Sequence, residues 1–125
     1  MKNNPVGWFE IYVQDLPRAR AFYERVLGTT LSPLPTPMPG LEMAAFPMDH
    51  TEPGATGALV QMADKDSGIG GTIIYFKCDD CAVESARVTP AGGQVVREKF
   101  SIGDYGHIAL VTDPDGNMFG LHSME

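Results

Sequence analysis

The alternation of apolar and polar residues near the N-terminus predicts a strand over residues 6–13. One face of this strand carries Trp8, Glu10 and Tyr12, and the other carries Phe9, Ile11 and Val13. Because the second set is entirely apolar, we expect it to pack under a helix. The first set is mixed, as the face of a concave sheet that holds a ligand would be.

A helix is predicted directly after this strand, between Asp15 and Gly28. Asp15 can accept hydrogen bonds from the free N–H groups at a helix start. Gly28 ends the helix, because glycine enters the left-handed region without steric cost. Between these two residues, apolar side chains recur at helical spacing: Leu16, Ala19, Phe22, Tyr23, Val26 and Leu27.

The same pattern of strand, acidic cap, short helix and glycine recurs over residues 72–93. Asp80 follows Asp15 by 65 residues, and Gly93 follows Gly28 by the same number. The second helix is expected to start near Asp79 or Asp80 and to be short, because Pro90 disfavours helix at the preceding residue. The chain therefore reads as two copies of one unit, each too small to bury its apolar face alone.

Further strands complete each copy. They are predicted at 29–34, 41–48 and 57–62 in the first copy, and at 94–98, 107–112 and 118–122 in the second, with loops over 33–40 and 99–106. The predicted fold class is α+β: two βαβββ modules form curved mixed sheets around a cleft. We expect one domain over residues 1–125, with modules at about 5–63 and 72–125 and a glycine-containing linker at about 64–71.

Composition and charge narrow the classes of function. The chain has 125 residues, of which 43% are hydrophobic and 20% charged, as in ordinary soluble domains. A net charge of −7 argues against nucleic acid or an anionic membrane as partner. No apolar run is long enough for a transmembrane helix, and residues 1–10 lack the apolar core of a secretory signal. We therefore expect a cytoplasmic protein.

Three stretches of the chain resemble the vicinal oxygen chelate superfamily, which includes glyoxalases, extradiol dioxygenases and bleomycin-resistance proteins. They are IYVQDLPRARAFYERVLG, its repeat ending in AGG, and the closing ALVTDPDGNMFGL. The strand GWFEIYV is similar to that of a glyoxalase-like branch of this superfamily. The resemblance covers nearly the whole chain and implies the paired-module fold and a homodimer. It does not fix the function, because this fold hosts many functions.

In metal-dependent members of the family, four strands each supply one metal ligand. The resemblance places these positions at Trp8, Gln61, Gly120 and Ile73, or at Thr72 if the register slips by one residue. Indole cannot ligate a metal, isoleucine and glycine have no ligand atom, and a lone glutamine amide is a poor ligand. We therefore predict no metal and no cofactor, with a divalent metal as the alternative.

The predicted cleft face carries candidate binding and catalytic residues. Trp8 either fills the former metal cavity or forms an aromatic floor for an organic ligand. Glu10 is a candidate general acid or base together with Tyr75, its counterpart 65 residues later. Alternatively, Glu10, Tyr12, Tyr75 and Lys77 form a structural polar network, in which Glu10 pairs with Lys77. The proline-rich loop over 33–40 is expected to cap the cleft.

Other candidate residues have simpler structural interpretations. His122 shares a face with Gly120, so it either reaches the cleft or ends a strand at the surface. The pair Cys78 and Cys81 has the spacing of redox and zinc motifs. One pair is half a zinc site, however, and the two aspartates between the cysteines oppose thiolate formation. We therefore favour a structural role for both thiols.

Hypotheses from different functional classes follow. We predict a glyoxalase-like small-molecule-binding protein with a degenerate metal site, which holds an organic ligand in a largely apolar cleft. The alternative is a lyase, isomerase or dioxygenase. It would use either a metal bound through residues such as Glu10, Gln61 and His122, or acid–base chemistry by Glu10 and Tyr75. A sensory or accessory domain that acts through a partner protein is a third hypothesis.

Overall fold

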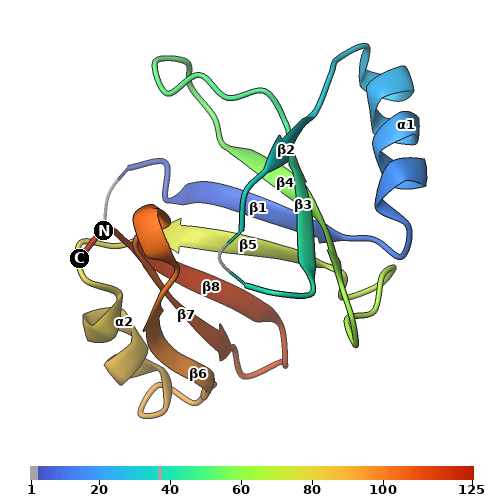
Figure 1. The fold of residues 1–125 in the computed structure, drawn as a ribbon. Helices are drawn as coiled ribbons and strands as arrows, with labels where there is room; N and C mark the ends of the chain where they lie inside the picture. Colours follow the sequence, from blue (N-terminus) through green and yellow to red (C-terminus); the bar gives the residue numbers. More distant parts are fainter. Residues whose placement is uncertain (1–2, 37) are drawn as a thin grey trace. The chain divides into compact units, whose positions relative to one another are not determined.

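The computed structural model describes residues 3–36 and 38–125 (Figure 1). Met1, Lys2 and Pro37, the last of which the sequence places in the proline-rich loop, lie outside the described residues. The elements are β1 (Val6–Tyr12), α1 (Leu16–Leu27), β2 (Ser32–Leu34), β3 (Leu41–Ala45), β4 (Thr56–Met62), β5 (Thr72–Lys77), α2 (Cys81–Val88), β6 (Gln94–Ser101), the 3-10 helix η1 (Gly103–Tyr105), β7 (His107–Thr112) and β8 (Met118–Ser123). The predicted α+β class and the doubled β-α-β-β-β order are confirmed.

The chain divides into two compact units, one formed by residues 8–72 and the other by residues 73–125 together with residues 3–7. In the first unit the strand order is β2-β3-β4-β1, with β1 parallel to β4 and the other neighbours antiparallel. Helix α1 covers one face of this sheet. Its contact with the sheet comprises the buried Leu31, Ala44 and Leu59, packed with Ile11, Val13, Leu16, Ala19, Tyr23 and Phe46. The apolar face of β1 thus lies under the helix, as predicted.

Both ends of α1 form as the sequence predicts. The Asp15 carboxylate accepts a hydrogen bond of 3.1 Å from the backbone N–H of Arg18. At the other end, Gly28 takes a left-handed conformation with φ of 64°, and its N–H donates to the carbonyl of Glu24. These two residues set the length of the helix, and with it the stretch of β1 and β4 that the helix covers.

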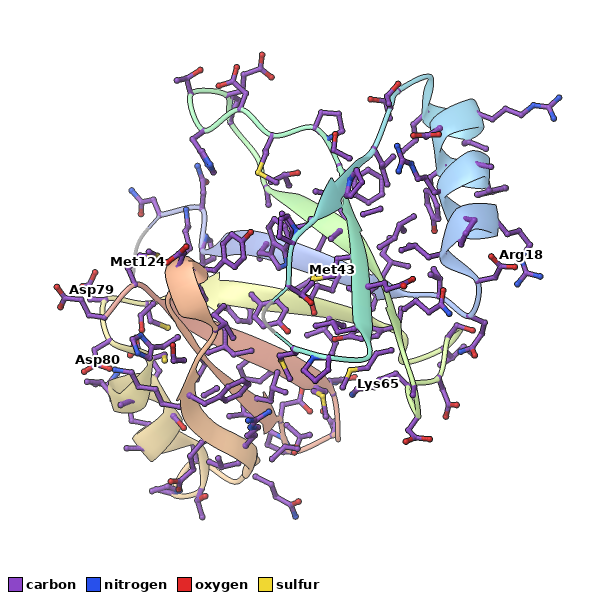
Figure 2. All side chains as sticks on the ribbon, in the orientation of Figure 1. Arg18, Met43, Lys65, Asp79, Asp80 and Met124 are labelled. Atoms are coloured by element: carbon purple, nitrogen blue, oxygen red, sulfur yellow. The ribbon has the colours of Figure 1, made fainter. Side chains whose placement is uncertain are left out.

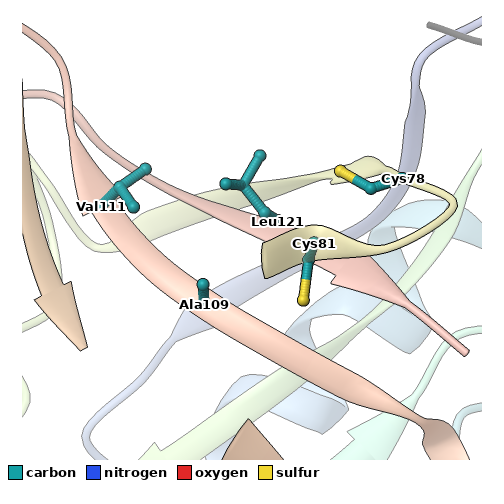
Figure 3. Close-up of a cluster of buried hydrophobic side chains, with 5 residues drawn as sticks. All are labelled: Cys78, Cys81, Ala109, Val111 and Leu121. Carbon is teal, nitrogen blue, oxygen red and sulfur yellow. The ribbon is translucent and has the colours of Figure 1, made fainter. Parts of the chain in front are cut away.

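In the second unit the strand order is β5-β8-β7-β6, with β5 parallel to β8. Helix α2 starts after Asp80, whose carboxylate accepts from the N–H of Ala82 at 3.0 Å, and ends at Val88, before Pro90. It packs on one face of the sheet. Figure 3 shows the buried cluster that joins the helix to the sheet, made of Cys81 from the first turn of α2 with Cys78, Ala109, Val111 and Leu121.

Two expectations about the second unit were wrong. Strand β6 continues to Ser101 through a stretch predicted to be a loop from Lys99 onward. Two register shifts, which absorb extra residues as β-bulges do, let it stay paired with β7. The residue with positive φ after α2 is Gly92, at 103°, and not Gly93. Position 93 needs glycine for another reason, because a Cβ there would lie 2.3 Å from the carbonyl oxygen of Thr112.

In the part of the chain that the structure describes, neither helix combines the length and the apolarity needed to span a bilayer.

Candidate functional site

The site in the first unit contains a row of three side chains on β1, of which Trp8 and Glu10 are partly exposed and Tyr12 is buried. The indole N–H of Trp8 donates to one oxygen of the Glu10 carboxylate at 3.2 Å. The hydroxyl of Tyr12 donates to the other oxygen at 2.9 Å. Alternation along the strand places all three on the face opposite α1. We call Trp8, Glu10 and Tyr12 the β1 triad: a carboxylate held between two aromatic rings.

A lysine that sequence reasoning missed approaches this triad. The ammonium of Lys65 lies 5.5 Å from the centre of the Tyr12 ring, within the range of a cation–π contact. The loop after β4 brings it there, and the side-chain amide of Gln14 donates to the Lys65 carbonyl at 3.0 Å (Figure 2 labels Lys65). No periodicity in the sequence marks this residue, because it belongs to a turn and not to a strand.

Gln61 lies on the other face of the same sheet. Strand pairing sets Glu10 beside Ala58 and Tyr12 beside Val60, so Gln61 points to the side that α1 covers. Its side-chain oxygen accepts from the N–H of Leu16 at 2.7 Å, at the start of α1. This placement corrects the expectation that Gln61 shares a face with Trp8. A register error of one residue moves a side chain to the opposite face of a sheet.

The second unit brings five of the predicted site residues onto one face. Tyr75 pairs with Gly120 and Lys77 with His122, and alternation adds Ile73 to this face. Tyr75 and Ile73 are buried. A Cβ at position 120 would lie 2.1 Å from the Tyr75 ring, so the ring occupies the space left by the missing side chain. Tyr75 therefore covers the face opposite α2 at the position where the sequence resemblance predicts the fourth metal ligand.

His122 makes a local hydrogen bond, and the side chain of Lys77 lies close to Gly7. Nε2 of His122 lies 2.6 Å from the carbonyl oxygen of Tyr105, so this nitrogen carries the proton and β8 is tied to η1. The stem of Lys77 passes beside Gly7, where a Cβ would lie 2.6 Å from Cγ of the lysine. The side chain of Lys77 fits beside residue 7 because that residue is glycine and has no Cβ.

The residues at the family's metal positions do not fit a divalent cation. Trp8, Ile73 and Gly120 have no side-chain atom that can ligate a metal, and Gln61, the remaining position, is turned to the other face of the sheet. Across residues 3–36 and 38–125, no three or more histidine, cysteine, aspartate or glutamate side chains gather in a way that could hold a metal ion.

Cys78 and Cys81 are both free and buried. Burial raises the pKa of the Cys78 thiol to about 12, and the nearby Glu84 carboxylate adds to this effect. A thiol with so high a pKa is a weak nucleophile at neutral pH. The geometry agrees with the structural role favoured for these two residues.

His107 also faces the side of the sheet that α2 covers, since it pairs with Ser123 at the start of β7. Its Nδ1 atom is buried and has no hydrogen-bond partner among the described residues. In a neutral imidazole protonated at Nε2, this atom is an acceptor and carries no proton.

Comparisons with known proteins place this geometry in a family. A model of the Glyoxalase/Bleomycin resistance protein/Dioxygenase superfamily matches residues 6–121. CFP32 of Mycobacterium bovis, which carries a provisional glyoxylase name, is 30% identical over 126 aligned positions that cover 91% of this chain. Its counterpart in Mycobacterium tuberculosis matches equally well. The chain spans 42% of the length of these relatives.

Solved structures show the same fold at low sequence identity. The hypothetical protein BH1468 from Bacillus halodurans has a TM-score of 0.73 at 16% identity, over 99% of this chain and 96% of that one. Methylmalonyl-CoA epimerase from Mycobacterium tuberculosis has a TM-score of 0.69 at 18% identity, over 100% and 93%. The Streptomyces coelicolor methylmalonyl-CoA epimerase, in complex with 2-nitronate-propionyl-CoA, has a TM-score of 0.68 at 19% identity, over 95% and 96%. Because the family model covers nearly the whole chain, this protein belongs to the Glyoxalase/Bleomycin resistance protein/Dioxygenase superfamily.

Proposed function

We propose that this protein binds a small organic ligand on the β1 triad and does so without a metal-dependent step. The observation that carries the proposal is the Glu10 carboxylate, which accepts one hydrogen bond from Trp8 and one from Tyr12. The partly exposed ring of Trp8 offers flat apolar surface, and the carboxylate offers an acceptor that fixes a ligand's orientation. The side chains at the former metal positions support binding over metal catalysis, because they supply no ligand atoms.

The first ligands to test follow from the family. The Streptomyces coelicolor epimerase was solved with an acyl-CoA analogue, so short acyl-CoA esters are one class. Adducts of α-ketoaldehydes with thiols and planar aromatic compounds are two others. We include in this proposal a cytoplasmic location and a homodimer, the latter tested by sedimentation of the purified chain.

The chain's one tryptophan makes the test direct, because Trp8 is itself a member of the triad. We expect a ligand to change Trp8 fluorescence in a saturable way and to raise the melting temperature, since it binds the native state. The Glu10→Gln variant keeps the shape of the side chain and is expected to weaken binding about fivefold or more.

Glu52→Gln is the matched control, because it removes the same charge from an exposed turn. It is expected to leave the affinity unchanged. Saturable binding by calorimetry with no change in Trp8 emission, and with equal affinity for Glu10→Gln, would place the ligand elsewhere. Stoichiometric divalent metal in protein purified without chelator would also contradict the proposal.

One observation favours acid–base catalysis as a second candidate. The Tyr12 hydroxyl lies 2.9 Å from Glu10, which is within reach of a proton transfer. Glu10 would remove a proton next to the carbonyl of a bound ester. NMR of an acyl-CoA ester in D2O measures this as exchange of the α-proton. Glu10→Gln would then abolish the exchange while ligand binding persists, whereas no exchange with the native protein would dismiss this candidate.

A further inference from the structure

A cavity lies in the first unit, apart from the β1 triad. It has a volume of about 620 Å³ and is lined by residues 13–14, 38–42 and 61–64, together with Thr36. None of the three triad residues lines it. Pockets for small organic molecules span roughly 300–1,000 Å³, so this one is large enough for a ligand of its own.

The charged side chains in the lining of this cavity are carboxylates. Glu42, at the start of β3, and Asp64, just after β4, come from different elements and both line the space. Within the described residues that form the wall there is no lysine, arginine or histidine. Lys65 follows Asp64 directly, but its ammonium lies over the Tyr12 ring. The electrostatics of the wall therefore favour a positive charge.

The neutral groups in the wall add acceptor and apolar surface. The amide nitrogen of Gln14 donates to the carbonyl of Lys65, so the side-chain oxygen of Gln14 is the group left to accept from a ligand. Met38 and Met62 contribute thioether chains, which are polarisable and adapt to alkyl groups. Because Met38 and Met62 stand in the same wall as the exposed residues Glu42 and Asp64, an alkylated ammonium ion would contact both kinds of side chain.

We propose that this cavity binds a small organic ammonium ion. The two carboxylates supply the attraction, and the methionines contact the alkyl groups of the cation. The net charge of −7 on the chain raises the local concentration of cations around it. This site goes beyond the proposed function, since it uses neither the β1 triad nor its ligand.

The experiment compares choline with 3,3-dimethyl-1-butanol, a neutral molecule of nearly the same shape. Amide NMR spectra of the full chain are recorded at increasing concentrations of each. We expect choline to shift the amides of residues 14, 42 and 62–64 saturably, and the neutral alcohol to bind more weakly by a factor of about ten, because it lacks the charge that the carboxylates attract. No saturable shift by choline at these residues, or equal binding of the two molecules, would overturn the proposal.

Three variants separate this site from general attraction to an acidic protein. Glu42→Gln and Asp64→Asn are each expected to weaken choline binding about fivefold. Asparagine suits position 64 because Asp64 has φ of 66°, a left-handed conformation that asparagine tolerates. Glu52→Gln makes the same change of charge outside the cavity and is expected to leave the affinity unchanged.

A loss of affinity in Glu52→Gln equal to that in the other two variants would overturn the proposal, because binding would then follow net charge alone. Choline-induced shifts centred on residues 8, 10 and 12 would overturn it as well, by placing the cation on the triad. Each of these outcomes leaves the fluorescence test of the proposed function to be decided separately.

Discussion

The ring of Tyr75 fills the space that Gly120 leaves open on the neighbouring strand. The two residues pair between β5 and β8, and a Cβ added to Gly120 would lie 2.1 Å from Cδ1 of the tyrosine. Tyr75 is 5% exposed, so the contact is part of the packed interior. A large side chain opposite a missing one keeps the volume filled.

Gly120→Ala is expected to lower the free energy of unfolding by about 1–3 kcal/mol, because the added methyl group overpacks this contact. Urea denaturation measures the loss. In a Tyr75→Ala background the ring is absent, and the same substitution at position 120 should cost less. Costs that simply add in the double variant would show that the ring and the glycine are not coupled.

The amide of Gln61 is expected to stabilise α1 by accepting from Leu16. Gln61→Ala should therefore lower the free energy of unfolding by about 1 kcal/mol. Gln61→Glu keeps an acceptor and places a negative charge near the N-terminus of the helix, which is favourable. We expect the glutamate variant to stay close to the native stability in urea denaturation. Equal losses in both variants would contradict the role of Gln61 as a cap.

The Cys78 thiol is expected to react slowly with iodoacetamide at pH 8 in the folded protein and quickly in urea. Its pKa in the folded state is about 12, mainly because of burial, against an ordinary value of 9.0. Between these two pH values the unfolded chain releases a proton that the folded chain keeps. The contribution of this thiol to stability is thus fully present below pH 9.0 and is lost as the pH rises toward 12.

Cys78→Ala tests the cause of this alkaline loss, because alanine has no proton to release. Its stability should fall less steeply between pH 9 and 12 than that of the native chain. Rapid alkylation of the folded protein at pH 8 would instead indicate an accessible thiolate, and would reopen the redox interpretation of the two cysteines.

Asp80 is expected to contribute to stability above its ordinary pKa and to lose that contribution in acid. The Lys99 ammonium, 2.8 Å from Asp80, and the N–H of Ala82 hold the pKa of this carboxyl below its usual value of 3.8. Because the folded pKa is the lower one, protonation below pH 3.8 removes the stabilisation.

Two substitutions at position 80 separate the ion pair from the helix cap. Asp80→Asn keeps an oxygen for the N–H of Ala82 and loses the charge facing Lys99, whereas Asp80→Ala loses both. We expect the melting temperature to be lowest for the alanine variant. Lys99→Met should reduce the acid dependence and leave the cap intact, and identical melting temperatures in all three variants would dismiss both contributions.

The order of elements, the N-caps of both helices, the C-cap of α1 and the family could be predicted from the sequence alone. Asp15, Gly28 and Asp80 act on backbone groups a few residues away, so local sequence determines them. The β1 triad was predicted as one face for the same reason, because alternation within a strand is a local property. The doubled pattern, 65 residues apart, indicated the repeated unit without any knowledge of its pairing.

The tertiary structure decided which strands pair and in what register, and this determined the rest of the site. Pairing of β4 with β1 turned Gln61 toward α1, and a loop carried Lys65 to the ring of Tyr12. The match of Tyr75 with Gly120 and the carboxylates of Glu42 and Asp64 around one cavity arose in the same way. Such contacts depend on the register between segments distant in sequence, and a pattern read along one segment does not contain that register.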